Sequence, residues 1–297
     1  MGFDTVTALL GARIMTPVEQ AYLHLLKKTL TGYPFDLGDQ LMLLGLGSVE
    51  PALVNAIGEW AVEGQSVAER FGFIPSLRAF GMDWPANADT MIGLARLNNI
   101  EHCLVHVLKN NVPGDVAEAG VWRGGAAIFM RAVLKVYGDE QRKVWLADSF
   151  QGLPKPDVAH YPADFGNSLW AFDPLAVSLE TVEANFARYG LLDDQVRFVK
   201  GWFSDTLPAA PVGKLAVLRI DGGMYESTIL ALRSLYRKVS PGGFVILDDY
   251  GCVPACRQAV NDFRAEEGIG ETIHPIDWTG VYWQTNASSE NSRGLGK

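Results

Sequence analysis

The sequence predicts an α/β fold built on a mostly parallel sheet of seven strands whose last strand runs antiparallel. Three observations lead to this prediction. From Gly114 onward, short apolar segments alternate with helical ones, which is typical of a parallel sheet covered by helices on both faces. A glycine-rich turn follows the first apolar segment, and acidic residues end several of the others. Only residues 277–280 separate the last two segments, which is too short for a crossover helix and indicates an antiparallel hairpin.

The individual elements are expected from the apolar periodicity and from the turn signals between segments. Strands are expected at 115–119, 144–147, 196–199, 215–220, 244–247, 271–276 and 281–284. Helices are expected at 18–30, 53–67, 90–108, 126–137, 179–189, 227–238 and 254–266. The chain is therefore expected to comprise a helical N-terminal extension (1–83), a sheet-bearing domain (84–285) and a polar, flexible tail (286–297).

The composition narrows the class of protein. The chain has 297 residues and a formal net charge of −9, whereas proteins that bind nucleic acids carry basic patches, so nucleic acid is not expected as a partner. No apolar run reaches the roughly 18–20 residues that a membrane helix needs, and the N-terminus lacks the basic region of a signal peptide. We therefore expect a cytoplasmic protein without membrane contact, with Cys103, Cys252 and Cys256 reduced.

A glycine-rich loop, residues 118–125, joins the first predicted strand to its helix. In an open α/β sheet this turn lies at the carboxyl ends of the strands, where ligands bind. Gly120, Gly124 and Gly125 would let the backbone approach a ligand, and the N–H groups at the start of the helix favour a carboxylate or phosphate. Glu118 would repel a pyrophosphate and pair with an ammonium group. The alternative is a purely structural turn.

Two further segments suggest a nucleoside-containing cofactor. Asp148 ends the second predicted strand, where an acid in nucleotide-binding folds accepts hydrogen bonds from ribose hydroxyls; the alternative is a helix cap. Trp202 and Phe203 follow the third strand and offer aromatic faces on which a purine could stack, although core packing is also open to them. An ammonium acceptor, a carboxylate-binding helix start, a ribose acceptor and an aromatic surface together match S-adenosylmethionine better than NAD.

Three acids end the fourth and fifth predicted strands. Asp221 follows one strand, and Asp248 and Asp249 follow the next, so neighbouring strands would bring their carboxylates together. Unpaired carboxylates at close range repel each other unless a cation neutralises them, and oxygen-only ligands suit Mg²⁺. Such an ion would lower the pKa of a bound hydroxyl. The alternative is that the two later acids only begin a loop and cap the following helix.

Several longer motifs make the chain recognisable. They read DWPANADTMIG (83–93), EAGVWRGG (118–125), ADSFQGLP (147–154), YGLLDD (189–194), GWF (201–203), and SPGG (240–243) followed by DDY (248–250). With these motifs the chain resembles the macrocin O-methyltransferase family, antibiotic-tailoring enzymes that methylate sugar or aromatic hydroxyls of macrolides and related natural products. The resemblance extends over about residues 84–284.

The resemblance implies a Rossmann-like class I methyltransferase fold, S-adenosylmethionine and Mg²⁺ as cofactors, and a homo-oligomer that acts on a small-molecule glycoside or catechol-like substrate. It implies cofactor contacts for Thr90, Met91, Glu118, Gly120, Val121, Trp122, Arg123, Asp148, Ser149, Phe150, Trp202 and Phe203. It implies metal ligation by Asp221, Asp248 and Asp249. The chain departs from the family pattern at Gly223, where similar enzymes carry an acid, and at 31–80, which is longer and expected near the substrate entrance or a subunit interface.

The expected reaction is direct methyl transfer to one hydroxyl of a sugar on a glycosylated natural product, with Mg²⁺ chelating a vicinal diol. The catechol methyltransferases, similar in fold, use a lysine where this chain has Met224, so another group must be the base. Asp221 is the first candidate for catalysis, followed by Asp249 and then His160.

The loop at 152–174 is long for an α/β connection. It carries Tyr161, Phe165, Trp170 and Phe172 and is expected to form an apolar lid over the substrate, the alternative being plain surface packing. Two other functions stay open at this point. One is an NAD-dependent sugar oxidoreductase or epimerase, although the chain has neither the dinucleotide glycine spacing nor a Tyr-x-x-x-Lys pair. The other is a non-catalytic cofactor-binding protein of the same fold.

Overall fold

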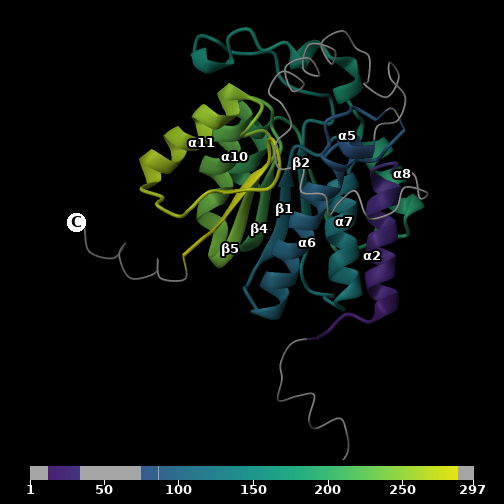
Figure 1. Ribbon diagram of the computed structural model, residues 1–297. Helices are drawn as coiled ribbons and strands as arrows, with labels where there is room; N and C mark the ends of the chain where they lie inside the picture. Colours follow the sequence, from purple (N-terminus) through teal and green to yellow (C-terminus); the bar gives the residue numbers. More distant parts are fainter. Residues whose placement is uncertain (1–12, 34–74, 86, 287–297) are drawn as a thin grey trace, which may run out of the picture.

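A computed structural model describes residues 13–33, 75–85 and 87–286, and a single twisted sheet runs through this part of the chain (Figure 1). Its strands are β1 (Asp115–Ala119), β2 (Val144–Asp148), β3 (Val196–Lys200), β4 (Leu215–Ile220), β5 (Val239–Leu247), β6 (His274–Pro275) and β7 (Val281–Gln284). They lie in the order β3-β2-β1-β4-β5-β7-β6. The first five strands pair in parallel, whereas β7 runs antiparallel to both β5 and β6. The predicted sheet and its closing hairpin are confirmed.

Helices cover both faces of this sheet. They are α2 (Pro17–Leu30), α5 (Pro75–Ala79), α6 (Gly93–Lys109), α7 (Gly125–Val136), α8 (Leu179–Arg188), α9 (Phe203–Thr206), α10 (Tyr225–Leu235) and α11 (Pro254–Glu267). Figure 1 shows α6, α7 and α2 on one side of the strands and α10 with α11 on the other. Right-handed crossovers between parallel strands produce this three-layer arrangement. The carboxyl ends of β1 to β5 are therefore left for the connecting loops.

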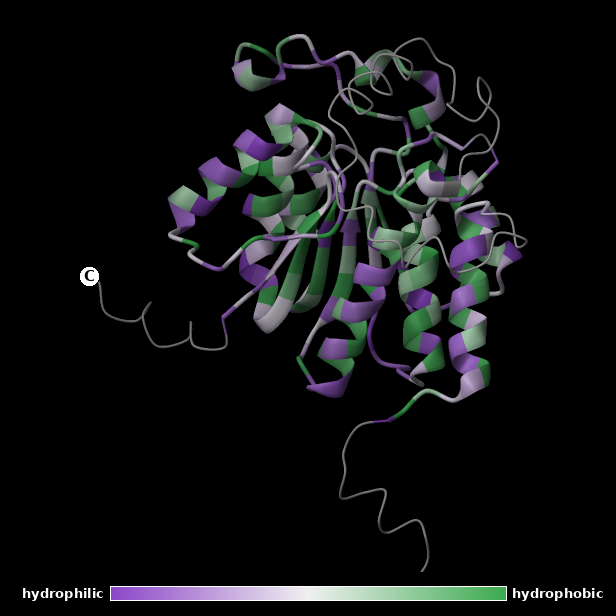
Figure 2. Ribbon diagram, in the orientation of Figure 1, coloured by the Kyte–Doolittle hydropathy of each residue, from purple (hydrophilic) through white to green (hydrophobic). Residues whose placement is uncertain are grey.

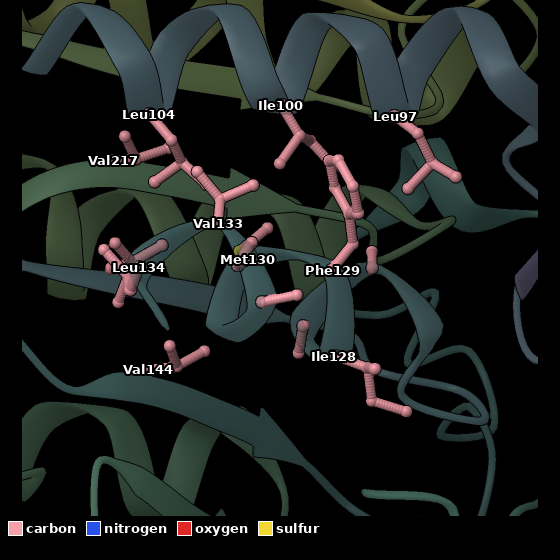
Figure 3. Packing of buried hydrophobic residues seen from close by; sticks show 14 of the residues in the cluster. Leu97, Ile100, Leu104, Ile128, Phe129, Met130, Val133, Leu134, Val144 and Val217 are labelled. Atoms are coloured by element: carbon pink, nitrogen blue, oxygen red, sulfur yellow. The ribbon is translucent and has the colours of Figure 1, made fainter. Parts of the chain in front are cut away.

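Two apolar cores hold the layers together. Figure 2 shows hydrophobic residues concentrated along the strands and along α7, while α2 and α11 alternate between hydrophobic and hydrophilic positions. In the larger core, Leu97, Ile100 and Leu104 of α6 point toward Phe129 and Val133 of α7 (Figure 3). The second core joins α10 and α11 to the other face of β4 and β5. Because α7 is buried on both sides, the glycine loop that precedes it is held in place.

The structure differs from the expected elements at several places, among them β5, which begins at Val239 rather than residue 244. Helix α6 begins at Gly93 rather than residue 90, because Gly93 has a φ of +74° and a left-handed residue interrupts a right-handed helix. Strand β6 has two residues, since only β7 pairs with it. Helix α2 forms as predicted, with Leu23, Leu26 and Leu30 buried and with Val18 and Leu25 exposed.

Some predictions fall on segments that the structure leaves out. The helix expected at 53–67, most of the insertion 31–80 and the tail from residue 287 lie outside the described residues. The domain boundaries and the homo-oligomer stay predictions. No helix in the described ranges is long and apolar enough to cross a membrane.

The packing of α7 can be tested by truncating its central ring. Phe129→Ala should lower the free energy of unfolding by about 3–5 kcal/mol, because the ring is fully buried between α6 and the sheet. Val18→Ala, on a side chain that is 78% exposed, should change it by less than about 0.5 kcal/mol. Urea unfolding followed by circular dichroism measures both. Equal effects at the two positions would contradict the described core.

Candidate active site

A cavity of about 360 Å³ lies at the carboxyl ends of the parallel strands. The loops after β1, β2, β3, β4 and β5 all contribute to its wall, as the fold requires for a ligand site in an open α/β sheet. The predicted site residues that line it are Thr90, Met91, Glu118, Gly120, Val121, Trp122, Asp148, Ser149, Trp202, Phe203, Asp221 and Asp249. Residues chosen from six separate segments of the sequence therefore meet around one space.

The glycine loop after β1 approaches the loop after β4 very closely. Gly120 has a φ of +90°, and a Cβ built there would lie 1.8 Å from the carbonyl oxygen of Asp221. Only glycine fits this contact. Gly124, with a φ of +87°, then begins α7, and the N–H of Gly125 donates to the carbonyl of Asp89 at 3.0 Å. One of the N–H groups at this helix start is thus already used within the protein.

Glu118 lies at the inner end of the cavity and is 1% exposed. Its Oε1 accepts a hydrogen bond from Arg219, whereas its Oε2 is buried and has no partner. Burial raises the pKa of Glu118 to about 8, opposed by the Arg219 charge and reinforced by the nearby Asp221. Buried polar atoms in proteins normally have a hydrogen-bond partner, so the Oε2 of Glu118 is suited to a ligand group that carries a donor.

Arg219 joins the carboxylates of three strand ends. Its guanidinium, which is 1% exposed, forms ion pairs with Glu118, Asp221 and Asp248, at 2.9 Å for the pair with Asp221. No role was predicted for Arg219. Its position inside the apolar strand Leu-Ala-Val-Leu-Arg-Ile nevertheless indicates buried partners, because a buried arginine must be paired.

The expectation of unpaired acids is therefore wrong for Asp221, which pairs with Arg219, and also for Asp248. The Asp248 carboxylate is 4% exposed and lies between Arg219 and Arg96, bonded to both. Arg96 comes from α6 and also holds Asp277 at 2.9 Å, in the turn before β7. Arg96 was likewise not predicted, although its place between the buried Leu94 and Leu97 on α6 was the available sign.

Asp221, Asp248 and Asp249 do come together. Each offers an oxygen within 4.8 Å of the others. Burial and the Asp248 charge raise the pKa of Asp221, although Arg219 and Arg96 oppose this shift. The pKa of Asp249 is raised well above its usual range by burial and by Asp221. Asp221 and Asp249 face the cavity, whereas Asp248 stands behind them.

Asp148 has both of its oxygens engaged by backbone. They accept the N–H groups of Val121 and Phe150, each at 2.7 Å, which ties the loop after β1 to the loop after β2. Burial raises the pKa of Asp148, opposed by these bonds. The carboxylate thus stabilises two turns and also lines the cavity, and since neither turn starts a helix, Asp148 is not the helix cap that was the alternative.

Three predicted side chains lie elsewhere. Arg123 donates to the carbonyls of residues 85 and 88, and the Phe150 ring packs against Phe198 at 6.2 Å between ring centroids. His160, the third candidate for the base, has a side chain that is 77% exposed and paired with Asp157. The three cysteines are free, as predicted.

Other residues line the cavity that the sequence did not reveal. Trp84, Leu153, Leu169, Leu175, Glu226, Ser227 and Leu230 contribute to it. The three leucines between 153 and 175 belong to the loop at 152–174 or follow it directly, so this loop does border the cavity. None of the four aromatic residues predicted for the lid, Tyr161, Phe165, Trp170 and Phe172, contributes. Trp84 and the leucines make part of the wall apolar, while the carboxylates make part of it acidic.

The class of the protein follows from this arrangement. A parallel sheet with an antiparallel β7, helices on both faces and a ligand-sized cavity over the glycine loop is the architecture of the class I methyltransferases. Such a fold implies S-adenosylmethionine as the methyl donor. Within this class the chain belongs to the Macrocin-O-methyltransferase (TylF) family, whose family model matches residues 19–285. It is therefore an O-methyltransferase, and the NAD-dependent alternative is wrong.

Relatives support the same assignment. The chain is 55% identical over 216 residues (72% of this chain, 82% of the relative) to the 8-demethyl-8-(2,3-dimethoxy-alpha-L-rhamnosyl)-tetracenomycin-C 4'-O-methyltransferase of Streptomyces olivaceus. It is 48% identical over 247 residues (82% and 97%) to the Mycinamicin III 3''-O-methyltransferase of Micromonospora griseorubida. The solved structure of the O-methyltransferase NovP superposes with a TM-score of 0.77 at 45% identity, covering 90% of this chain and 99% of NovP.

The raised pKa of Glu118 predicts a pH dependence of stability. Between its ordinary pKa of 4.5 and about 8, folded Glu118 holds a proton that the unfolded chain releases. The free energy of unfolding should therefore fall as pH rises through this window, for this group by at most about 1.4 kcal/mol per pH unit. Glu118→Gln should flatten the fall, measured by thermal unfolding in EDTA without cofactor. Identical slopes in both proteins would contradict the shift.

Proposed function

We propose that this O-methyltransferase transfers a methyl group from S-adenosylmethionine to a hydroxyl of a sugar carried by a glycosylated natural product. The observation that carries the proposal is the unpartnered Oε2 of Glu118 in the same cavity as the acid cluster. The names of the relatives, which specify a rhamnosylated tetracenomycin and mycinamicin III, support a sugar-bearing acceptor. The cavity volume of about 360 Å³ is in the range of small-molecule sites.

The cofactor would occupy the side of the cavity next to the glycine loop. Glu118 suits its ammonium group, because one buried oxygen still lacks a donor. Asp148 and the aromatic rings of Trp202 and Phe203 suit the ribose and the purine. The same loops carry the other proposed contacts, which are Thr90, Met91, Gly120, Val121, Trp122 and Ser149. For Arg123 and Phe150 only the backbone is available, since their side chains are engaged elsewhere.

The acid cluster suits Mg²⁺. Its donor set is oxygen only, and Asp221 and Asp249 face the cavity while Asp248 stands within reach behind them. Charge supports the same proposal. Five connected carboxylates, those of Glu118, Asp221, Asp248, Asp249 and Asp277, face the two guanidinium groups of Arg96 and Arg219. A divalent cation and a cofactor of net charge +1 would supply the positive charge that this cluster lacks.

The chemistry requires a base beside the acceptor hydroxyl. When bound, S-adenosylmethionine supplies the methyl group and Mg²⁺ makes a nearby hydroxyl more acidic. Asp221 is the best candidate to accept the proton, because its side chain keeps 30% exposure and burial, together with the Asp248 charge, raises its pKa. Asp249 is the second candidate. Glu118 and the glycine loop would orient the donor, and positioning would contribute most of the acceleration.

Replacing the proposed base gives a direct test. Asp221→Asn should lower turnover by at least about 100-fold, the contribution typical of general-base catalysis, while the cofactor dissociation constant stays within about tenfold. Mass spectrometry would detect methyl transfer to mycinamicin III and to the rhamnosylated tetracenomycin, and calorimetry would measure cofactor binding. Asp194→Asn, on an exposed turn before β3, is the matched control. Turnover of Asp221→Asn equal to that of the control would refute the assignment.

Removal of divalent metal provides a second test. Dialysis against EDTA should abolish methyl transfer, and added Mg²⁺ should restore it. Without the cation that the clustered carboxylates would hold, nothing lowers the pKa of the acceptor hydroxyl. The matched variant is Asp249→Asn, which should need a higher Mg²⁺ concentration for half-maximal rate than the wild type. Full activity after exhaustive chelation would rule out the metal.

A further inference from the structure

The lid, defined as residues 152–174, contains one carboxylate that is completely buried. Asp164 is 0% exposed and ends a short 3₁₀ turn, Pro162–Asp164. Its Oδ1 accepts the N–H of Tyr225 at 2.7 Å, and its Oδ2 accepts the N–H of Glu226 at 3.0 Å. A lid residue thus caps the first turn of α10 from about sixty positions upstream.

This cap replaces one that α10 lacks locally. The N-cap residue Met224 makes no side-chain hydrogen bond to the helix. The first N–H groups of any α-helix have no acceptor within the helix, and the positive end of the helix dipole favours a negative charge. If the lid moved away, the N–H groups of Tyr225 and Glu226 and the carboxylate of Asp164 would all lose their hydrogen-bond partners together. The lid is therefore held at a definite place on the helix.

A second lid contact reaches the acid cluster. The Nδ2 of Asn167 donates to the carbonyl of Gly223 at 3.2 Å, and the N–H of Gly223 donates to Asp249 at 3.0 Å. Gly223 has a φ of +63°, and a Cβ there would lie 3.3 Å from Leu153 of the lid. The absence of a side chain at Gly223 lets the lid rest on the loop that follows β4.

The turn that Asp164 caps also borders the cavity. Glu226, Ser227 and Leu230 of α10 line the cavity, and so do Leu153 and Leu169 of the lid. Leu153 and Leu169 lie beside Gly223, close to Asp249, and Ser227 lies beside Gly222, so they border the loop that follows Asp221. A change in the contact between lid and α10 would therefore alter the acceptor side of the cavity first.

We propose that Asp164 is a positioning residue that latches the lid onto α10 and so shapes the acceptor side of the site. This inference rests on the proposed function insofar as the acceptor binds beside Asp221 and Asp249. The latch itself consists of two hydrogen bonds to Asp164, and the protection of the two N–H groups can be measured without any acceptor.

The latch is tested by hydrogen–deuterium exchange resolved to single amides by NMR, with the full chain. In Asp164→Ala, the amides of Tyr225 and Glu226 should exchange about 3- to 30-fold faster than in the wild type, as loss of a helix cap implies. Asp164→Asn retains one acceptor oxygen, so one of the two amides should stay protected. Asp157→Ala, which removes an exposed lid carboxylate bonded to His160, is the matched control and should change neither amide.

Steady-state kinetics tests the positioning role. With whichever of mycinamicin III and the rhamnosylated tetracenomycin is methylated, Asp164→Ala should raise the acceptor KM by about 3- to 30-fold and the cofactor KM by less than about twofold. Asp164→Asn should recover part of the difference, and it serves alone if the alanine variant does not fold. Unchanged exchange at both amides would overturn the latch. Equal rises in the acceptor KM and the cofactor KM would overturn the role of Asp164 on the acceptor side. A wild type that is inactive on both compounds would count against the proposed function, and the exchange result would still test the latch.

Discussion

The guanidinium of Arg219 lies in the middle of the sheet, where water cannot solvate it, and it must be balanced by carboxylates from neighbouring strands. Glu118 is its register partner on β1, and Asp248 follows β5 on the other side. One buried cation thus aligns the ends of three strands. Truncating any member would leave an uncompensated charge in a dry environment, which destabilises more than losing a surface pair.

The network that Arg219 requires extends beyond the sheet. Asp248 also binds Arg96 of α6, and Arg96 holds Asp277 in the turn before β7. A helix that precedes the sheet in sequence and the hairpin that closes it are therefore joined through the strand ends. Acids still outnumber guanidinium groups, and the same burial raises the pKa values of Glu118, Asp221 and Asp249. The buried ion pairs and the raised pKa values have one electrostatic origin.

Much of this arrangement could be predicted from the sequence because it depends on local patterns. Alternating apolar segments predicted the sheet and its hairpin, and acids at strand ends predicted which carboxylates meet. Arg96 and Arg219 were missed because pattern analysis treats each segment separately, whereas their partners come from other elements. The sequence did not show which apolar side chains of α2 are buried, since Val18 and Leu23 are both apolar and only tertiary packing decides between them.

The lid could not be predicted in detail for a different reason. Its three short 3₁₀ turns have no hydrophobic periodicity, and its attachment depends on Asp164, a polar residue whose partners are backbone N–H groups of a distant helix. The two sides of the cavity are thus built differently. The charged side chains lie at strand ends, where ion pairs fix their positions. Fixed charges of this kind are what electrostatic stabilisation of a transition state requires. The apolar side belongs to a segment without a β-ladder, which hydrogen bonds of Asp164 and Asn167 tie to α10 and to Gly223.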